Sequence, residues 1–147
     1  LLEKEPDFSV GDKIEAAVDW PRRYAIMKLH SASHIMEYFL SEILGPLTRD
    51  RAFVNEKYAR MTYEYATKLP PEKLAEVEEK ANEFIGRNFE INLQPHEKYP
   101  EYTYFLCGEI IEPCTGIHPE NTKELGSVKL KRKSGGRGKE MVMVYLA

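Results

Sequence analysis

Two short pairs of metal-ligating residues, far apart in the chain, constrain the fold more than any other feature of the sequence. His30 and His34 are four residues apart, and Cys114 and His118 have the same spacing. On a helix, residues four apart lie on one face with Cβ atoms roughly 5–6 Å apart, which lets two imidazoles bind one ion. If both pairs share that ion, the fold must place the middle of a helix against a loop from the last third of the chain.

The chemistry of these four side chains indicates which metal they would hold. One thiolate and three imidazoles suit Zn²⁺, whereas Mg²⁺ and Ca²⁺ prefer oxygen ligands. Pro113 and Gly116 bend the loop around the second pair, so that its thiolate and imidazole can converge. The alternative is coincidence, because an isolated cysteine usually belongs to a core. Two pairs that use three of the four histidines favour a shared site, while Cys107 and His96 fit a strand and a polar loop.

Apolar residues recur at helical spacing in two segments. The first runs from Arg22 to Leu44, with Asp19 as its N-cap and Gly45 at its end. The second begins at Pro70 and Pro71 and ends before Gly86. The sequence therefore predicts two main helices, and the histidine pair lies in the middle of the first.

Shorter segments have the composition and alternation of strands. They are residues 13–18, 53–66, 89–93, 102–111, 127–133 and 140–146. The last two are joined by the glycine-rich residues 134–138, which predicts a hairpin. Two helices among several short strands predict an α+β fold with a mostly antiparallel sheet.

The composition limits the class of protein. A chain of 147 residues, 42% of them hydrophobic, can bury the core of one domain, so we expect a single domain over residues 1–147. No run of about 18 apolar residues is present, which excludes a membrane-spanning helix. Two cysteines cannot form a disulfide framework, so we expect a reduced, cytoplasmic protein.

Charge is unevenly distributed along the chain. The formal net charge of −3 argues against a wholly basic nucleic-acid binder, yet residues 121–140 contain seven basic and two acidic residues. Such a hairpin could bind a phosphate backbone. The alternative is a solvated hairpin whose lysines protect an edge strand from aggregation. The basic side chains of this hairpin that would contact phosphates are Lys131, Arg132, Lys133 and Arg137.

Position 31 excludes one class of zinc enzyme. Metalloproteases with an H-E-x-x-H helix use the glutamate as general base, and this chain has Ser31 at that position. Four protein ligands also close a zinc tetrahedron, which is typical of structural sites, whereas catalysis needs an open position or one loose ligand. The residues alone leave both roles open.

The sequence around the four ligands resembles a known family. The stretches are WPRR at 20–23, MKLHSASH at 27–34, ANEFI at 81–85, CTGIH at 114–118 and NTKELG at 121–126. In this order they resemble the AlaX trans-editing alanyl-tRNA deacylases, with their patterns H-T-x-x-H, C-x-G-T-H and N-T-x-E-[IL]-G. The resemblance implies the fold of the editing domains of alanyl- and threonyl-tRNA synthetases. The glycine-rich barrel of longer members is absent, so the sequence resembles the short type.

The resemblance also implies a function. Members of this family hydrolyse the ester that joins a wrong amino acid, chiefly serine and sometimes glycine, to tRNA(Ala). A synthetase pocket that selects by size cannot strongly exclude such amino acids, so a second hydrolytic site supplies the missing accuracy. By this resemblance the zinc ligands are His30, His34, Cys114 and His118.

Other roles follow from the same resemblance. Ser31 replaces the usual threonine after the first histidine, and we expect its hydroxyl to read the substrate serine. We expect phosphates of the tRNA acceptor end to be held by the basic hairpin, with help from Arg22 or Arg23, although these two arginines could instead only solvate the start of the helix.

Two other functions remain open from the sequence. The chain could be a non-catalytic, zinc-stabilised RNA-binding module derived from an editing domain, since a closed zinc site and a basic hairpin both permit it. It could also be a zinc hydrolase that cleaves a small ester or thioester and does not need tRNA.

Overall fold

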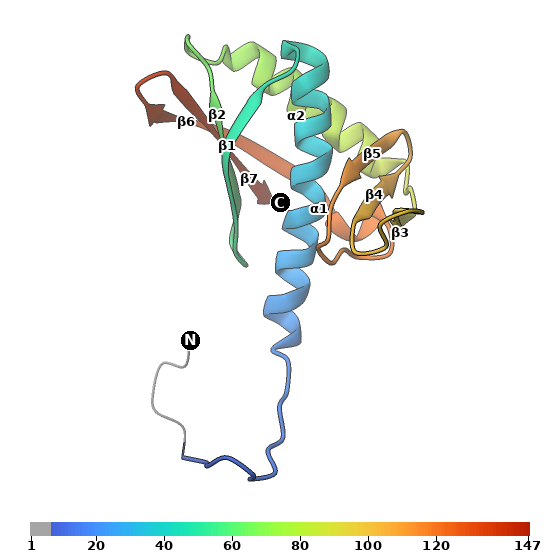
Figure 1. Cartoon of the computed structure of the whole chain (residues 1–147). Helices are drawn as coiled ribbons and strands as arrows, with labels where there is room; N and C mark the ends of the chain where they lie inside the picture. The colour runs from blue at the N-terminus through green and yellow to red at the C-terminus, as the bar shows by residue number, and fades with distance from the viewer. Residues whose placement is uncertain (1–6) are drawn as a thin grey trace.

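The computed structural model describes residues 7–147 and confirms the α+β class. Each of the two main helices is followed by a group of strands (Figure 1). In order, the elements are α1 (Trp20–Leu44), β1 (Thr48–Val54), β2 (Ala59–Glu64), α2 (Pro71–Gly86), β3 (Ile91–Pro95), β4 (Thr103–Cys107), β5 (Ile110–Pro113), the short 3-10 helix η1 (Thr122–Leu125), β6 (Val128–Gly136) and β7 (Lys139–Leu146).

The predicted first helix is confirmed at both ends. The Asp19 carboxylate accepts a hydrogen bond from the backbone amide of Arg22 at 3.1 Å, and Gly45 ends the helix with a φ of 85°. The first turns of α1 are exposed and extend below the rest of the molecule (Figure 1). Seven of the eight residues from Leu29 to Met36 are buried, so the helix is covered on nearly all sides where the histidine pair lies.

The second helix is also confirmed. Its buried stripe packs against α1 and the β6 side of the larger sheet. The stripe consists of Leu74, Val77, Ala81, Phe84 and Ile85.

The strands form two antiparallel sheets, where the sequence suggested one. The larger sheet has the order β1-β2-β7-β6, and the smaller has the order β3-β4-β5. The predicted strand over 102–111 is a hairpin because Gly108 adopts a φ of 55°, in the left-handed region, and turns the chain. The predicted strand over 53–66 is divided by a turn in which the Asn55 side chain accepts from the amides of Lys57 and Tyr58, both at 2.9 Å.

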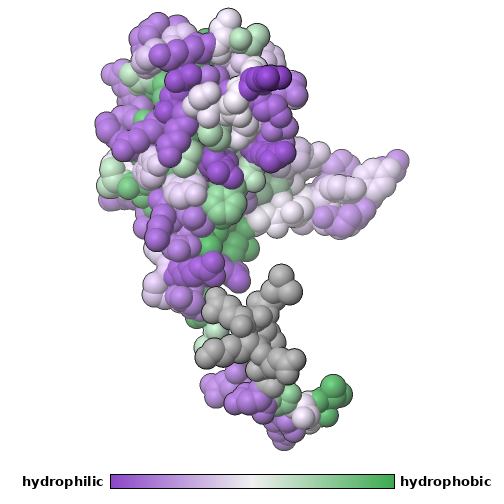
Figure 2. Space-filling view, turned by 90° about the vertical axis from the view of Figure 1, so that its left-hand side faces the viewer, coloured by the Kyte–Doolittle hydropathy of each residue, from purple (hydrophilic) through white to green (hydrophobic). Residues whose placement is uncertain are grey.

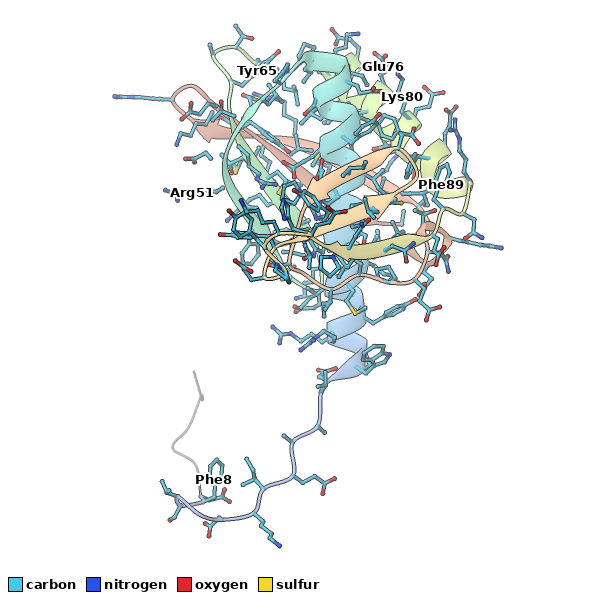
Figure 3. All side chains as sticks on the ribbon, turned by 45° about the vertical axis from the view of Figure 1, so that its right-hand side comes forward. Phe8, Arg51, Tyr65, Glu76, Lys80 and Phe89 are labelled. Carbon is cyan, nitrogen blue, oxygen red and sulfur yellow. The ribbon has the colours of Figure 1, made fainter. Side chains whose placement is uncertain are left out.

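The predicted strand over residues 13–18 is wrong. This segment is exposed and belongs to neither sheet of the described chain. It runs away from the body together with Phe8 (Figure 3). Alternating sequence alone does not make a strand, because the strand needs a neighbouring backbone for its hydrogen bonds.

The larger sheet, the helices and the smaller sheet form three layers. Both helices pack on one face of the larger sheet, and the smaller sheet packs near α1 through Phe105. The middle of α1 therefore lies between the two sheets. No helix among residues 7–147 combines the length and the apolar character needed to cross a bilayer.

Asn82 joins α2 to the larger sheet and provides a test of this packing. Its side-chain amide donates to the carbonyl of Val128 at 3.0 Å and accepts from the amide of Val128 at 2.8 Å. We expect Asn82→Ala to lower the free energy of unfolding by about 2 kcal/mol, because it leaves both backbone groups without a partner. Urea unfolding followed by circular dichroism measures this change. Glu79→Ala, on the exposed side of α2, is the control and should change stability by less than about 0.5 kcal/mol.

Candidate metal centre

The structure brings the two predicted pairs together. His30 and His34 come from α1, and Cys114 and His118 come from the loop after β5. One ligand atom from each of the four side chains lies within 4.8 Å of the other three. The sulfur of Cys114 is 3.5 Å from Nε2 of His30 and 3.4 Å from Nε2 of His118. These distances match the separation of about 3.3–3.8 Å expected between ligands on one tetrahedral zinc ion.

The loop reaches α1 because the smaller sheet holds its first residue. The amide of Cys114 donates to the carbonyl of Thr103 at 2.9 Å, which extends the pairing of β4 and β5 by one residue. The backbone of Gly116 then passes directly over the ring of His30, where a methyl group would collide with the imidazole. Glycine is therefore required at this position for the loop to approach the helix.

The imidazole of His34 is oriented for a ligand. Its Nδ1 lies 2.5 Å from the Glu112 carboxylate, which accepts a hydrogen bond from the Nδ1–H group. Its Nε2 is buried without a hydrogen-bond partner in the described structure and belongs to the four-atom cluster. A buried polar atom without a partner is costly unless something binds it, so this atom indicates a metal.

His118 is oriented in the same way by Ser31. The Ser31 hydroxyl donates to the carbonyl of Met27 at 3.2 Å, and its oxygen accepts from Nδ1 of His118 at 2.8 Å. This leaves Nε2 of His118 free to face the sulfur of Cys114. Ser31 itself is fully buried and does not line the neighbouring cleft. In this structure the Ser31 hydroxyl positions a ligand, and its expected role in reading a substrate hydroxyl stays a prediction.

The pKa values of the cluster differ between the thiol and the imidazoles. Burial raises the pKa of the Cys114 thiol, but hydrogen bonds from His118 and His30 outweigh it and bring this pKa down to about 3. Burial alone would lower the pKa of His34, but the nearby Cys114 sulfur and the hydrogen bond to Glu112 raise it to about 9. Burial lowers the pKa of His118. At pH 7, Cys114 is thus a thiolate, and His34 must release one proton before it can bind a metal.

A cleft of about 510 Å³ opens beside the cluster. Its lining includes His30 and Cys114 of the cluster together with Ala52, Phe53 and Val54 of β1. The cleft is large enough for an aminoacyl group attached to a nucleoside.

Glu37 is the only acidic residue among those that line this cleft. Its carboxylate accepts from Nη1 of Arg49 at 2.6 Å and from the Tyr63 hydroxyl at 3.0 Å. Burial raises the pKa of Glu37, and the charge of Arg49 opposes this shift. Sequence reasoning missed Glu37, although it lies seven residues after His30 and hence on the same face of α1. It also missed Glu112, because no local pattern shows that β5 crosses His34.

The basic residues predicted to hold phosphates do not line the cleft. Lys131 and Lys133 lie on the side of β6 that faces away from the helices, and Arg137 is exposed in the β6–β7 turn. Arg132 faces the opposite side, where its guanidinium donates to the buried Glu140 at 2.6 Å through Nη2. This bidentate ion pair occupies Arg132, and the phosphate contact expected of Arg132 stays a prediction.

The two arginines at the start of α1 lie apart from the metal centre. Arg22 is largely exposed and forms an ion pair with Glu56 at 3.5 Å, and Arg23 is exposed in the first turn of the helix. Neither arginine contributes to the cleft.

Comparisons with known proteins place this chain in a family. Residues 103–144, which contain Cys114 and His118, match the family model described as the threonyl and alanyl tRNA synthetase second additional domain. The alanyl-tRNA editing protein AlaX-M of Pyrococcus horikoshii is 34% identical over 97% of this chain and 67% of its own length. The chain belongs to the AlaX family of alanyl-tRNA editing proteins.

Other relatives extend this family relationship. AlaX-M of Methanosarcina mazei is 28% identical over 94% of this chain and 62% of its own length. The alanine–tRNA ligase of Campylobacter jejuni is 30% identical over 88% of this chain and 17% of the ligase. The chain thus spans about two thirds of the AlaX-M relatives and a small part of the ligases, in agreement with the expected kinship to synthetase editing domains.

The hydrogen bond between Glu112 and His34 can be tested by metal affinity. We expect Glu112→Ala to weaken zinc binding by about 10–100-fold, since the ring of His34 loses the partner that orients it. Glu112→Gln keeps an acceptor for the Nδ1 proton and should recover most of this loss. Competition with a chromophoric chelator measures the affinity. Glu109→Ala, an exposed acid in the adjacent turn, should bind zinc as the wild type does, and equal losses in all three variants would contradict the assignment.

The pKa values of the cluster predict the pH dependence of metal binding. His34 is protonated below pH 9 and must lose that proton, whereas Cys114 is already ionised above pH 3. Zinc affinity should therefore rise about tenfold per pH unit from pH 7 towards pH 9 and level off above it. The same competition assay across pH 6.5–9.5 measures the profile. An affinity that is constant between pH 7 and pH 9 would show that His34 does not release this proton.

Proposed function

We propose that this chain hydrolyses the ester bond of misacylated tRNA(Ala), chiefly Ser-tRNA(Ala) and also Gly-tRNA(Ala), with Zn²⁺ as its metal. The observation that supports the proposal most is the cluster of one cysteine and three histidines beside an open cleft. Two relatives of similar sequence are named alanyl-tRNA editing proteins, which supports the substrate class.

The donor set favours zinc. Zn²⁺ is borderline-soft and binds thiolate and imidazole, and its d¹⁰ configuration imposes no geometry that this cluster would have to meet. His30, His34, Cys114 and His118 would hold it. Bound there, the metal would supply a Lewis acid for the ester carbonyl or for an attacking water.

The residues of the cleft have separate roles in this proposal. Glu37 binds the α-ammonium group of the aminoacyl ester, because a rigid carboxylate partly removed from water favours a cation. Arg49 and the Tyr63 hydroxyl keep that carboxylate in place. Thr115 is exposed and lines the cleft, so its hydroxyl shares the substrate-reading role expected of Ser31. A site that hydrogen-bonds the serine hydroxyl disfavours alanine, which leaves the partner unpaired.

A deacylation assay tests the function. Wild type, Cys114→Ala and His118→Ala are incubated with Ser-, Gly- and Ala-tRNA(Ala), and metal content is measured on the same samples. We expect the wild type to release serine and glycine but not alanine, and each variant to lose at least about 100-fold in rate because the metal is lost or displaced. His96→Ala removes a histidine outside the cluster and should retain the wild-type rate. Undiminished turnover in both ligand variants would refute the zinc mechanism.

A chelator distinguishes the enzyme from a zinc-stabilised RNA-binding module. For an enzyme, zinc removal should abolish turnover while the far-ultraviolet circular dichroism spectrum remains folded, and added zinc should restore the rate. For a structural site, the same treatment should unfold the domain. A small-ester hydrolase would instead cleave seryl esters without tRNA at the same rate.

A further inference from the structure

One face of the larger sheet carries no helix within the described residues. Val128 and Val142 pack with both helices, so alternate residues on the same strands face the opposite side. We call this side the open face. Two cross-strand rows lie on it, Phe53–Arg60–Met143–Lys131 and Arg51–Thr62–Met141–Lys133. Viewed from the side on which this sheet lies, the surface is mostly hydrophilic with a smaller hydrophobic area (Figure 2).

Aromatic rings on the open face form a continuous series. The ring centroid of Tyr58 lies 5.9 Å from that of Phe53 and 6.1 Å from that of Tyr145. A cation lies over each end of the series, since Arg60 is 5.3 Å from the Phe53 ring and Lys131 is 5.4 Å from the Tyr145 ring. Planar rings beside cations are the elements with which proteins bind unpaired nucleobases and their phosphates.

The two rows on the open face are positively charged, whereas the next row on this side pairs Glu64 with Lys139. The two rows contain four basic residues and no acidic residue. Lys131 and Lys133 are exposed and form no ion pair within residues 7–147. Arg51 points away from α1 on β1 (Figure 3), and its side chain is 81% exposed although its Nε lies 3.6 Å from the Asp50 carboxylate. In contrast, Lys129 is held by Glu78 at 2.6 Å.

The aromatic series leads to the metal centre. Phe53 belongs to the series and also lines the cleft that contains His30 and Cys114. A strand bound across the sheet from β6 to β1 would therefore end at the cleft. We infer that the open face binds the single-stranded 3′ end of an RNA, with unpaired bases stacked on Tyr145, Tyr58 and Phe53 and phosphates on Lys131 and Arg60. This inference rests on the proposed function and adds the surface and the mode of binding.

An RNA fits this face better than a protein partner does. Protein interfaces are depleted of lysine and of charge at their centres, whereas the rows on the open face place a basic residue on three of the four strands. Stacking also explains why a series of aromatic rings has a cation at each end, because every base has an apolar face next to a charged backbone.

Binding of uncharged RNA tests the inference without any ester hydrolysis. The probe is a fluorescein-labelled single-stranded RNA of about twelve nucleotides, roughly one site size, and the variants are Tyr145→Leu and Lys131→Ala. We expect each variant to raise Kd at least about fivefold, and Lys131→Ala to reduce the slope of log K against log salt by about 0.7. A duplex of the same sequence should bind more weakly, because its bases cannot stack on the protein. Fluorescence anisotropy at several salt concentrations measures these quantities.

Matched controls keep the outcomes distinct. Tyr99→Leu and Arg87→Ala remove an exposed ring and an exposed cation far from the open face and should bind RNA as the wild type does. Equal binding by the wild type and both test variants, or no RNA binding by the wild type, would overturn the inference. So would self-association that is lost in Tyr145→Leu while the RNA affinity stays unchanged. Because the assay contains no aminoacyl ester, a failure here leaves the deacylation result unaffected, and a failed deacylation leaves this result interpretable.

Discussion

Two hydrogen bonds to imidazole Nδ1 atoms support the whole site. Glu112 fixes the ring of His34, and Ser31 fixes the ring of His118, so both Nε2 atoms face the thiolate of Cys114. Each bond also joins separate parts of the fold, because Glu112 belongs to the smaller sheet and Ser31 to α1. The centre is therefore built by the packing of the smaller sheet against α1 and cannot form on either part alone.

Local patterns predicted the two helices and the ligand set, because caps, apolar periodicity and i,i+4 spacing act within a few residues. They failed where a distant partner decides the outcome. The alternating residues 13–18 find no neighbouring strand, and one expected sheet is two. The contact of the buried Ser31 hydroxyl with His118 was likewise not visible in the sequence, and the substrate-reading role expected of Ser31 stays a prediction. The contact between Glu112 and His34 depends on tertiary packing that periodicity does not encode.

The two carboxylates near the metal ligands, Glu112 and Glu37, have different hydrogen-bond partners. Glu112 accepts a hydrogen bond from the ligand His34 and is thereby committed to the metal centre, whereas Glu37, about one turn after His34 on α1, lines the cleft. Burial raises the pKa of Glu37 and the charge of Arg49 opposes this shift, while hydrogen bonds from Arg49 and Tyr63 hold the carboxylate at the cleft. Phe53 then connects this polar cleft to the basic side of the sheet.

The side chain of Asn82 has an influence far from its own position. By pairing with both backbone groups of Val128, it fixes where β6 begins. Neighbouring residues of a strand point to opposite sides, so a slip of one residue would turn Lys131 and Lys133 inward and bring Leu130 and Arg132 to the solvent. An amide on α2 thus helps to set how many basic side chains an approaching polyanion would meet on the far side of the sheet.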